Sequence, residues 1–505
     1  MVNYQFTEGT ICAPATIPGT GAISIIRVSG KEALAIADKI IDFKGESLSE
    51  TEGYRLRYGT VFATDGSVLD NVIVSVFRAP HSYTGENSVE ISCHASRFIV
   101  NAILELLVNA GARIAAPGEF TRRAFVNGKM DLAQAEAVAD VIASQSAASH
   151  KVAMNQLKGG FSSELKVLRD KLLKMTSLLE LELDFSEEDV EFASRSELGA
   201  LVNEALSHIG RLTDSFSRGN AIKNGVPVAI VGATNTGKST LMNALLGEDR
   251  AIVSDIAGTT RDTIEEMLNL GGVMFRFIDT AGIRETDEIV EKIGIERTFK
   301  KMDEASIVLG MTDLSRGENS VLADAEYIWD KVNACVAGRE FLLLVNKCDV
   351  DESESVAAGE GHVAGYSGAG FTETGSGAGS ADKTGKMARI EAALREKGIS
   401  AKLIPISAKT GYGLTVLTEA LAEIGRRITG DTDETLVTNI RHYEALVRAA
   451  TALGRVRDGL QVATLPPDLI AQDLREALYH LGEIVGEIST EEVLGNIFRN
   501  FCIGK

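Results

Sequence analysis

The N-terminal quarter of the chain alternates short apolar runs with polar segments, as mixed α/β domains do. Residues 22–30, AISIIRVSG, predict a buried strand, and 71–77 and 88–95 alternate apolar and polar positions, as half-buried strands do. From Asp131 to about Ser217 apolar residues recur every three or four positions, which predicts amphipathic helices. We therefore expect an N-terminal α/β domain followed by a helical bundle.

Between about Asn224 and Gly425 the pattern changes to short apolar runs separated by glycine-rich turns and helical segments. Strands that alternate with helices are typical of a doubly wound sheet. After Asp431 the pattern is helical again, so we expect this α/β domain to be inserted into one discontinuous helical domain. A domain tolerates such an insertion when the two ends of its chain at the insertion point lie close together. The predicted strands of the inserted domain are 226–231, 273–278, 306–311, 341–345 and 402–406.

One segment of the predicted inserted domain has a different composition. Residues 351–386 hold nine glycines and five serines in 36 positions. Such a composition buries too little apolar surface to order itself, so it predicts a flexible loop.

Composition describes an ordinary globular protein of about two to four domains, with 505 residues, 45% hydrophobic and 24% charged. The first residues lack a basic stretch followed by an apolar one, so no secretory signal is expected. Five cysteines without a C-x-x-C pair suit reduced thiols and a cytoplasmic location, rather than disulfides or a zinc site. The net charge of −20 argues against a general nucleic-acid coat but allows a local basic patch.

The stretch GATNTGKST, 232–240, follows the predicted strand 226–231 and precedes a helix. It is a complete G-x-x-x-x-G-K-[ST] motif in the strand–loop–helix context that makes the motif specific. Backbone N–H groups of such a loop wrap phosphate, Lys238 would reach the β- and γ-phosphates, and Ser239 would bind Mg²⁺. The sequence predicts a nucleoside triphosphate site.

Four further motifs complete the pattern of a guanine-nucleotide site, two at the phosphates and Mg²⁺ and two at the base. DTAG (279–282) ends one strand, GTTRD (258–262) supplies Thr260 to the Mg²⁺ shell, NKCD (346–349) ends another strand, and SAK (407–409) adds a backbone contact. Asp349 can accept hydrogen bonds from guanine N1–H and the 2-amino group, a donor pair that adenine lacks. The predicted GTP-binding residues are Asn235, Thr236, Gly237, Lys238, Ser239, Thr240, Ser254, Asp255, Ile256, Ala257, Gly258, Thr259, Thr260, Asp279, Thr280, Ala281, Gly282, Asn346, Lys347, Asp349, Ser407, Ala408 and Lys409.

The predicted catalytic apparatus departs from the Ras pattern. Ile283 follows DTAG where Ras-like enzymes carry the glutamine that orients water. Asn235 offers an amide oxygen that could hold a monovalent cation where an arginine finger would act. Its alternative role is to shape the loop.

Motifs along the whole chain resemble one family, MnmE (TrmE), the tRNA wobble-uridine modification GTPases. They are APATIPGTGAISIIRVSG, PGEFTRRAFVNGKMDLAQAEAVADVI, GATNTGKSTLMNAL, SDIAGTTRDTI, DTAGIRETDEIVEKIGIER, TNIRHYEAL and the terminal CIGK. The glycine-rich insertion departs from the family's core. The resemblance implies an N-terminal α/β domain that binds folate and dimerises (1–125), a helical domain in two parts (126–223 and 426–505), and an inserted Ras-like G domain (224–425).

The resemblance also implies the activity. A GTPase activated by K⁺ would work with MnmG, a partner that contains FAD, to install an aminomethyl or carboxymethylaminomethyl group at C5 of the wobble uridine of certain tRNAs. The one-carbon unit would come from 5-formyl- or 5,10-methylene-tetrahydrofolate.

Site residues follow from the same resemblance. K⁺ would be held by Asn235, Ser254, Ile256 and Thr259, and Glu291 would orient the attacking water through a second water. From the residues alone, Glu291 lies in a charged run, which favours a solvated helix face over a catalytic role. The residues that would bind the carboxylates and the pterin of folate are Arg27, Glu90, Lys129 and Lys505. Without the resemblance, each would be an ordinary surface charge.

Cys502, in the terminal CIGK, has two competing roles. It is either a catalytic thiol activated by a neighbouring cation or a small packing residue beside Phe498 and Phe501. A lipid anchor is disfavoured, because Gly504 and Lys505 fit a prenylation box poorly.

Two other functions share part of these motifs. A ribosome-assembly GTPase would usually add a basic RNA-binding domain, which the acidic flanks do not suggest. A dynamin-like scaffold would need a basic membrane-binding loop, and none is visible in the sequence.

Overall fold

The computed structural model describes two compact units, one from 1–143, 152–214 and 439–505 and the other from 144–151 and 215–438. The residues that the structure describes are 9–184, 195–248, 266–278, 305–334, 339–349, 379–399, 401–430, 434–461, 466–488, 494–495, 497–498, 501 and 504.

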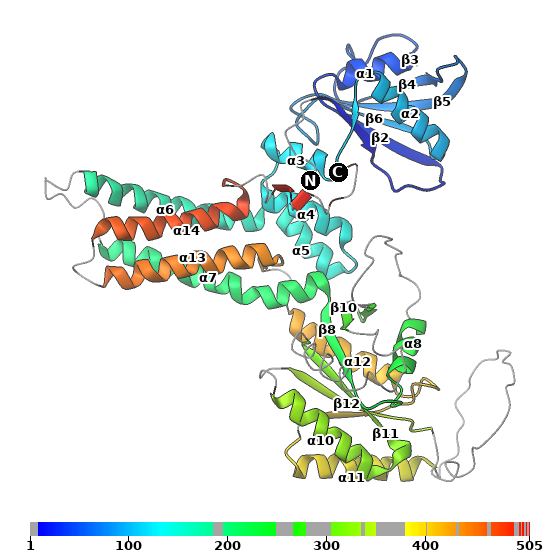
Figure 1. The fold of residues 1–505 in the computed structure, drawn as a ribbon, viewed down its shortest axis with the longest axis vertical. Coiled ribbons are helices and arrows are strands. Elements are labelled where there is room, and N and C mark those ends of the chain that lie inside the picture. Colours follow the sequence, from blue (N-terminus) through cyan, green and yellow to red (C-terminus); the bar gives the residue numbers. More distant parts are fainter. Residues whose placement is uncertain are drawn as a thin grey trace, which may run out of the picture. The chain divides into compact units, whose positions relative to one another are not determined.

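The first unit begins with a seven-stranded sheet in the order β3-β4-β5-β6-β2-β1-β7 (Figure 1). Neighbouring strands are antiparallel except β1 and β7, which are parallel. Helices α1 and α2 pack on one face, where alternate strand residues such as Val28 and Ile91 are fully buried. The elements are β1 Ile11–Pro14, β2 Ile23–Ser29, α1 Ala33–Ile40, β3 Ile41–Phe43, β4 Arg55–Phe62, β5 Val68–Phe77, β6 Ser88–His94, α2 Arg97–Asn109, β7 Arg113–Ile114 and α3 Glu119–Val126.

The structure confirms the predicted strands 22–30, 71–77 and 88–95 as β2, β5 and β6. It adds β1, β3, β4 and β7. Strand β4 escapes a pattern-based prediction because Leu56 and Tyr58 lie on its solvent side, 69% and 62% exposed, so its apolar residues do not mark the buried face.

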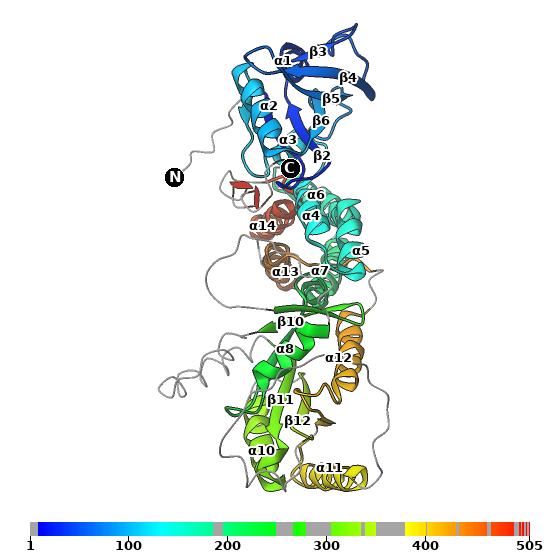
Figure 2. The ribbon, with the colours of Figure 1, turned by 90° about the vertical axis from the view of Figure 1, so that its right-hand side faces the viewer.

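Helices form the rest of the first unit, and the start of α5 and the end of α7 belong to the second. Helices α13 and α14 pack side by side and α14 packs on α6, and Figure 2 views them nearly along their axes. The predicted amphipathic helix is confirmed as α6, while α7 continues to Asn224, beyond the predicted end at Ser217, and so enters the second unit. The bounds are α4 Leu132–Ala143, α5 Ala147–Leu157, α6 Gly160–Asp184, α7 Arg195–Asn224, α13 Ile440–Leu460 and α14 Pro467–Val485.

The second unit is a six-stranded sheet in the order β13-β12-β11-β8-β10-β9, covered on both faces by helices (Figure 1). Helices α8 and α12 bury one face and α10 and α11 the other. All five predicted strands are confirmed. The elements are β8 Val226–Val231, α8 Lys238–Glu248, β9 Glu266–Leu270, β10 Val273–Ile278, β11 Ile307–Asp313, the 3₁₀ turn η2 Leu314–Arg316, α10 Glu318–Ala334, β12 Glu340–Asn346, α11 Gly379–Glu396, β13 Lys402–Pro405 and α12 Leu414–Thr429.

The sheet is mixed, because β9 runs antiparallel to β10, whereas the other neighbours are parallel. An antiparallel edge strand is common in doubly wound sheets. One prediction for this unit needs correction. The flexible loop predicted over 351–386 ends earlier, since α11 begins at Gly379; residues 351–378 lie outside the described part of the chain. A helix extends cheaply once nucleated, so the strong helical sequence after Lys386 carries the helix back into glycine-rich residues. No helix within the described ranges is long and apolar enough to span a bilayer.

Candidate functional site

The P-loop leaves the carboxyl end of β8 and runs into the first turn of α8. Strand β8 lies between β10 and β11. The connection from β10 to β11 therefore crosses from one side of β8 to the other, and the loop after β8 occupies the switch point where doubly wound sheets bind ligands. Gly237 has φ +100°, and a Cβ there would lie 2.4 Å from the Asn346 amide nitrogen. The backbone can therefore turn closely past Asn346 only with glycine at this position.

Lys238 is held over the loop. Its Nζ donates to the carbonyl oxygens of Gly232 and Ala233, at 2.8 and 2.7 Å. Burial lowers the pKa of Lys238, since it penalises the charged ammonium. Ser239 and Thr240 follow in the first turn of α8, where free backbone N–H groups and the helix dipole favour an anion.

Asn235 is exposed at the tip of the loop and adopts φ +62°. Asparagine is one of the few side chains that tolerates this region, so the conformation supports the loop-shaping role. Its amide also faces solvent, where a cation could reach it. Both roles considered for Asn235 therefore fit the structure.

Asn346 joins the P-loop to the predicted guanine loop. Its Nδ2 donates to the carbonyl of Thr236 at 2.7 Å, and its Oδ1 accepts from the backbone N–H of Ala408 at 2.9 Å. The side chain is 3% exposed. One buried amide thus ties together segments from the carboxyl ends of β8, β12 and β13.

The residues after β12 and β13 form the rest of this edge. Lys347, at φ +62°, pairs with Asp313 at the end of β11, Nζ to Oδ2 2.6 Å. Asp349 is exposed, and Cys348 N–H donates to the carbonyl of Ile406. Ser407 is buried, its carbonyl accepts from the N–H of Gly411, and Lys409 is exposed. The second unit therefore brings the P-loop, NKCD and SAK to one edge of the sheet.

The remaining predicted residues of the nucleotide site lie outside the described ranges. They are Ser254, Asp255, Ile256, Ala257, Gly258, Thr259, Thr260, Asp279, Thr280, Ala281, Gly282, Ile283 and Glu291. Cys502 and Lys505 also lie outside them.

A second candidate site surrounds Arg27 in the first unit. Arg27 and Glu90 are cross-strand neighbours on β2 and β6, and their side chains pair at 2.8 Å. The Arg27 guanidinium lies 5.1 Å from the ring centre of Tyr83 and 5.6 Å from that of Phe120, and Nη1 donates to the carbonyl of Gly504 at 3.3 Å. The end of the chain therefore meets the N-terminal sheet here.

Sequence reasoning did not identify the two aromatic residues of this cluster. Tyr83 lies in a turn-rich segment, and Phe120 lies in the first turn of α3 within the PGEFTRRAF motif. An aromatic residue alone does not mark a binding site. Burial raises the pKa of Tyr83, whose hydroxyl is 2.8 Å from that of Thr121. Lys129 is exposed and its Nζ donates to the carbonyl of Pro80 at 3.0 Å, so its described contact is not with Arg27 or Glu90.

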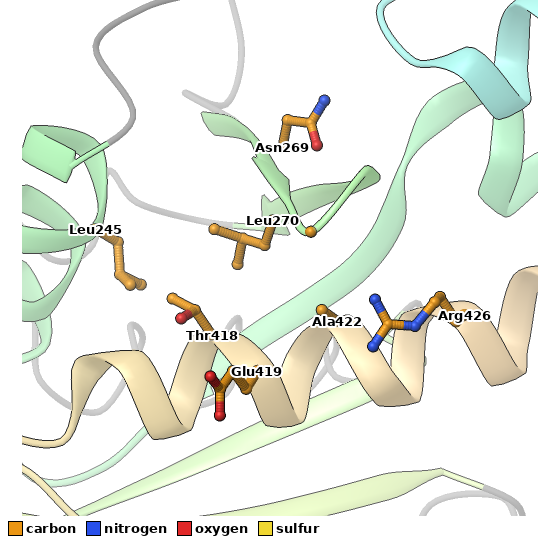
Figure 3. Close-up of a pocket in the computed structure, with 8 residues that line it drawn as sticks. Leu245, Asn269, Leu270, Thr418, Glu419, Ala422 and Arg426 are labelled. Atoms are coloured by element: carbon orange, nitrogen blue, oxygen red, sulfur yellow. The ribbon is translucent and has the colours of Figure 1, made fainter.

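A separate hollow of about 350 Å³ in the second unit lies beside α8, the β9–β10 hairpin and α12 (Figure 3). Among the predicted site residues that the structure describes, none lines it. Its walls combine apolar Leu245, Leu270 and Ala422 with exposed Glu419 and Arg426. The described motif residues therefore lie at the carboxyl edge of the sheet and not in this hollow.

Known proteins resemble this chain over nearly its whole length. A family model described as "GTP-binding protein TrmE N-terminus" matches residues 10–129, and one described as "MnmE helical domain" matches 132–502. A tRNA modification GTPase MnmE of Parabacteroides distasonis is 49% identical over 499 residues, which cover 98% of this chain and 100% of that protein. The Bacteroides fragilis protein of the same name is 48% identical over 500 residues, covering 99% and 100%. Among solved structures, Era of Aquifex aeolicus aligns with 45% of this chain and 66% of its own at 23% identity, and its TM-score of 0.27 is too low to carry an argument.

Proposed function

The chain belongs to the MnmE family of tRNA modification GTPases, and from this premise we propose that it hydrolyses GTP in the modification of tRNA wobble uridines. The observation that carries the proposal is the buried Asn346 amide, which connects the phosphate-binding loop with the base-binding loop. Enzymes that bind a nucleotide by both its phosphates and its base need these two loops in a fixed relation. We propose the cytoplasm as its location.

The metal ions have separate proposed sites. Ser239, at the start of α8, and Thr260 would hold Mg²⁺, which would neutralise negative charge that develops on the phosphates. Asn235, Ser254, Ile256 and Thr259 would hold K⁺. The exposed position of Asn235 at the tip of the P-loop supports this assignment. Glu291 would orient the attacking water, the role that Ile283 cannot fill.

We expect GTP turnover to be faster in K⁺ than in Na⁺ by on the order of tenfold or more, because no arginine finger is evident in the sequence and a cation must neutralise the charge instead. Asn235→Ala should remove most of this difference, measured as phosphate release in the two salts. Thr234→Ala, at the neighbouring exposed position, is the matched control. Equal wild-type rates in K⁺ and Na⁺ would exclude the cation site.

The Arg27 cluster is the proposed folate site, made of Arg27, Glu90, Lys129 and Lys505. A guanidinium offers five N–H donors, so Arg27 keeps donors for a folate carboxylate beyond those used on Glu90 and Gly504. Tyr83 and Phe120 supply flat apolar surface beside it. Bound folate would supply the one-carbon unit.

The proposed partners follow from the family and from one exposed surface. The face of the N-terminal sheet opposite α1 and α2 exposes Leu56, Tyr58 and Ile73, from 48% to 69%. Exposed apolar side chains on a sheet mark an interaction surface, and a second copy of the chain is the proposed occupant. MnmG, which would carry FAD, and tRNA are the other proposed partners.

The proposed domain layout keeps the predicted boundaries: 1–125, 126–223, 224–425 and 426–505. The chain leaves α7 and returns beside it, since the Ser215 hydroxyl accepts from the N–H of Val437 at 3.0 Å. Adjacent exit and return points favour a G domain inserted into the helical domain.

We expect the chain to restore wobble-uridine modification in a bacterial strain that lacks its own MnmE, measured by mass spectrometry of tRNA nucleosides. A wild-type chain that hydrolyses GTP but restores ribosome assembly in place of tRNA modification would overturn the proposed function.

Cys502→Ser should abolish the modification while GTP hydrolysis continues, if the thiol takes part in the chemistry. Fully modified tRNA in that variant would assign Cys502 to packing.

A further inference from the structure

A buried ion cluster joins two family motifs that no predicted site uses. Arg441, in TNIRHYEAL, makes a two-pronged pair with Glu136, in the AEAVADVI stretch: Nε to Oε1 is 3.0 Å and Nη2 to Oε2 is 2.9 Å. Glu136 is 8% exposed, and His442 Nε2 lies 2.6 Å from its Oε2. Burial alone would raise the pKa of Glu136, but His442 and Arg441 outweigh burial and lower it to about 2, so the carboxylate stays charged.

Arg441 also binds the end of a third helix. Its Nη1 donates to the carbonyl of Glu483 at 2.7 Å and its Nη2 to that of Ile484 at 3.1 Å. Both carbonyls belong to the last turn of α14, where such groups lack partners within the helix. A single guanidinium therefore binds the carboxyl end of α14. We define the C-terminal tail by the described residues that follow this helix: 494, 495, 497, 498, 501 and 504.

Helix α4, which carries Glu136, also contacts this tail. Leu132 and Ala135 share a buried cluster with Leu494, Phe498 and Phe501. The ring centres of Phe498 and Phe501 are 5.3 Å apart, and the two residues are 3% and 9% exposed. Glu136 is the next residue after Ala135, so the tail and Arg441 contact adjacent positions of one helix.

The tail ends in a contact with little tolerance. Gly504 has φ +102°, and a Cβ there would lie 2.1 Å from the carbonyl oxygen of Pro14 on β1. From this position its own carbonyl accepts the hydrogen bond of Arg27. A small shift of the tail would therefore break the contact with Arg27.

We propose that Arg441 is a positioning residue. It binds the carboxyl end of α14, which precedes the tail, and Glu136 on α4, against which the tail packs. These two contacts keep the tail in place against Arg27. The inference rests on the proposed function, in which the Arg27 cluster takes part in tRNA modification. Replacing a buried ion pair by apolar groups often leaves stability unchanged, so a two-pronged pair in this position is better explained by the geometry it imposes.

The test compares Arg441→Met with wild type by hydrogen–deuterium exchange in the purified, full-length, nucleotide-free protein. We expect exchange at the described tail residues to rise at least about tenfold and wobble modification in cells to fall to a similar degree. GTP hydrolysis should stay within about twofold of wild type. Arg441→Lys should restore the tail only partly, because an ammonium cannot make the two-pronged pair.

Arg448→Met is the matched control. Arg448 lies two turns along α13 and pairs with Glu444 at 3.5 Å, with both side chains more than half exposed. The control should exchange like wild type. If Arg441→Met unfolds the helices, Glu136→Gln, which keeps the volume of the side chain, should release the tail.

Unchanged tail exchange in a folded Arg441→Met or Glu136→Gln protein overturns the inference, and so does loss of the helical circular dichroism signal in both. Tail exchange is measured without tRNA or nucleotide. A wild-type chain that fails to modify tRNA would therefore overturn the proposed function, while the exchange data would still show whether Arg441 positions the tail.

Discussion

Asp349→Asn should lower the affinity for GTP by about 10³-fold and raise that for xanthosine triphosphate. The carboxylate is the acceptor for both guanine donors, and two charge-assisted hydrogen bonds contribute about 4 kcal/mol together. Xanthine presents a carbonyl where guanine has its amino group, and an amide can donate to it. The measurement is competition of each nucleotide against a fluorescent GTP analogue.

Asp330→Asn is the control for this change. It makes the same substitution at an exposed position on α10 of the same unit. It should leave both affinities unchanged. Undiminished GTP preference in Asp349→Asn would show that NKCD does not read the base.

Asn346→Ala should weaken GTP binding by about 10²-fold. The change leaves the Thr236 carbonyl and the Ala408 N–H without their partner in a buried place, and each loss costs about 1–3 kcal/mol. The P-loop and the SAK loop would then no longer be held in register. Affinity is measured as for Asp349→Asn, with circular dichroism to show that the variant is folded.

Two companion variants sharpen this result. Asn346→Asp keeps an acceptor for Ala408 but places a carboxylate oxygen against the Thr236 carbonyl, so it should bind GTP no better than Asn346→Ala. Asn269→Ala removes one amide contact, to the N–H of Gly272, in the hairpin of the same sheet and should bind like wild type. Wild-type affinity in Asn346→Ala would mean that the amide bridge does not organise the site.

The elements of the nucleotide-binding unit could be predicted from local sequence. Parallel strands buried on both faces are continuous apolar runs, and every residue of 226–231 is buried, as such a run requires. The P-loop was equally readable, because its glycines, lysine and hydroxyl act within nine consecutive residues. Strand β9 was missed because an edge strand of five residues leaves little pattern to detect.

Local sequence is enough to show which segments bury apolar surface and which short motifs are typical of phosphate and base binding, since both depend on residues a few positions apart. Which distant residues meet follows only from the three-dimensional fold. Asn346 reaches Thr236 across 110 positions, and Arg441 reaches Glu136 across 305. The type of a polar residue says that it needs a partner but not where the partner lies, because the fold chooses the partner when it excludes water from both.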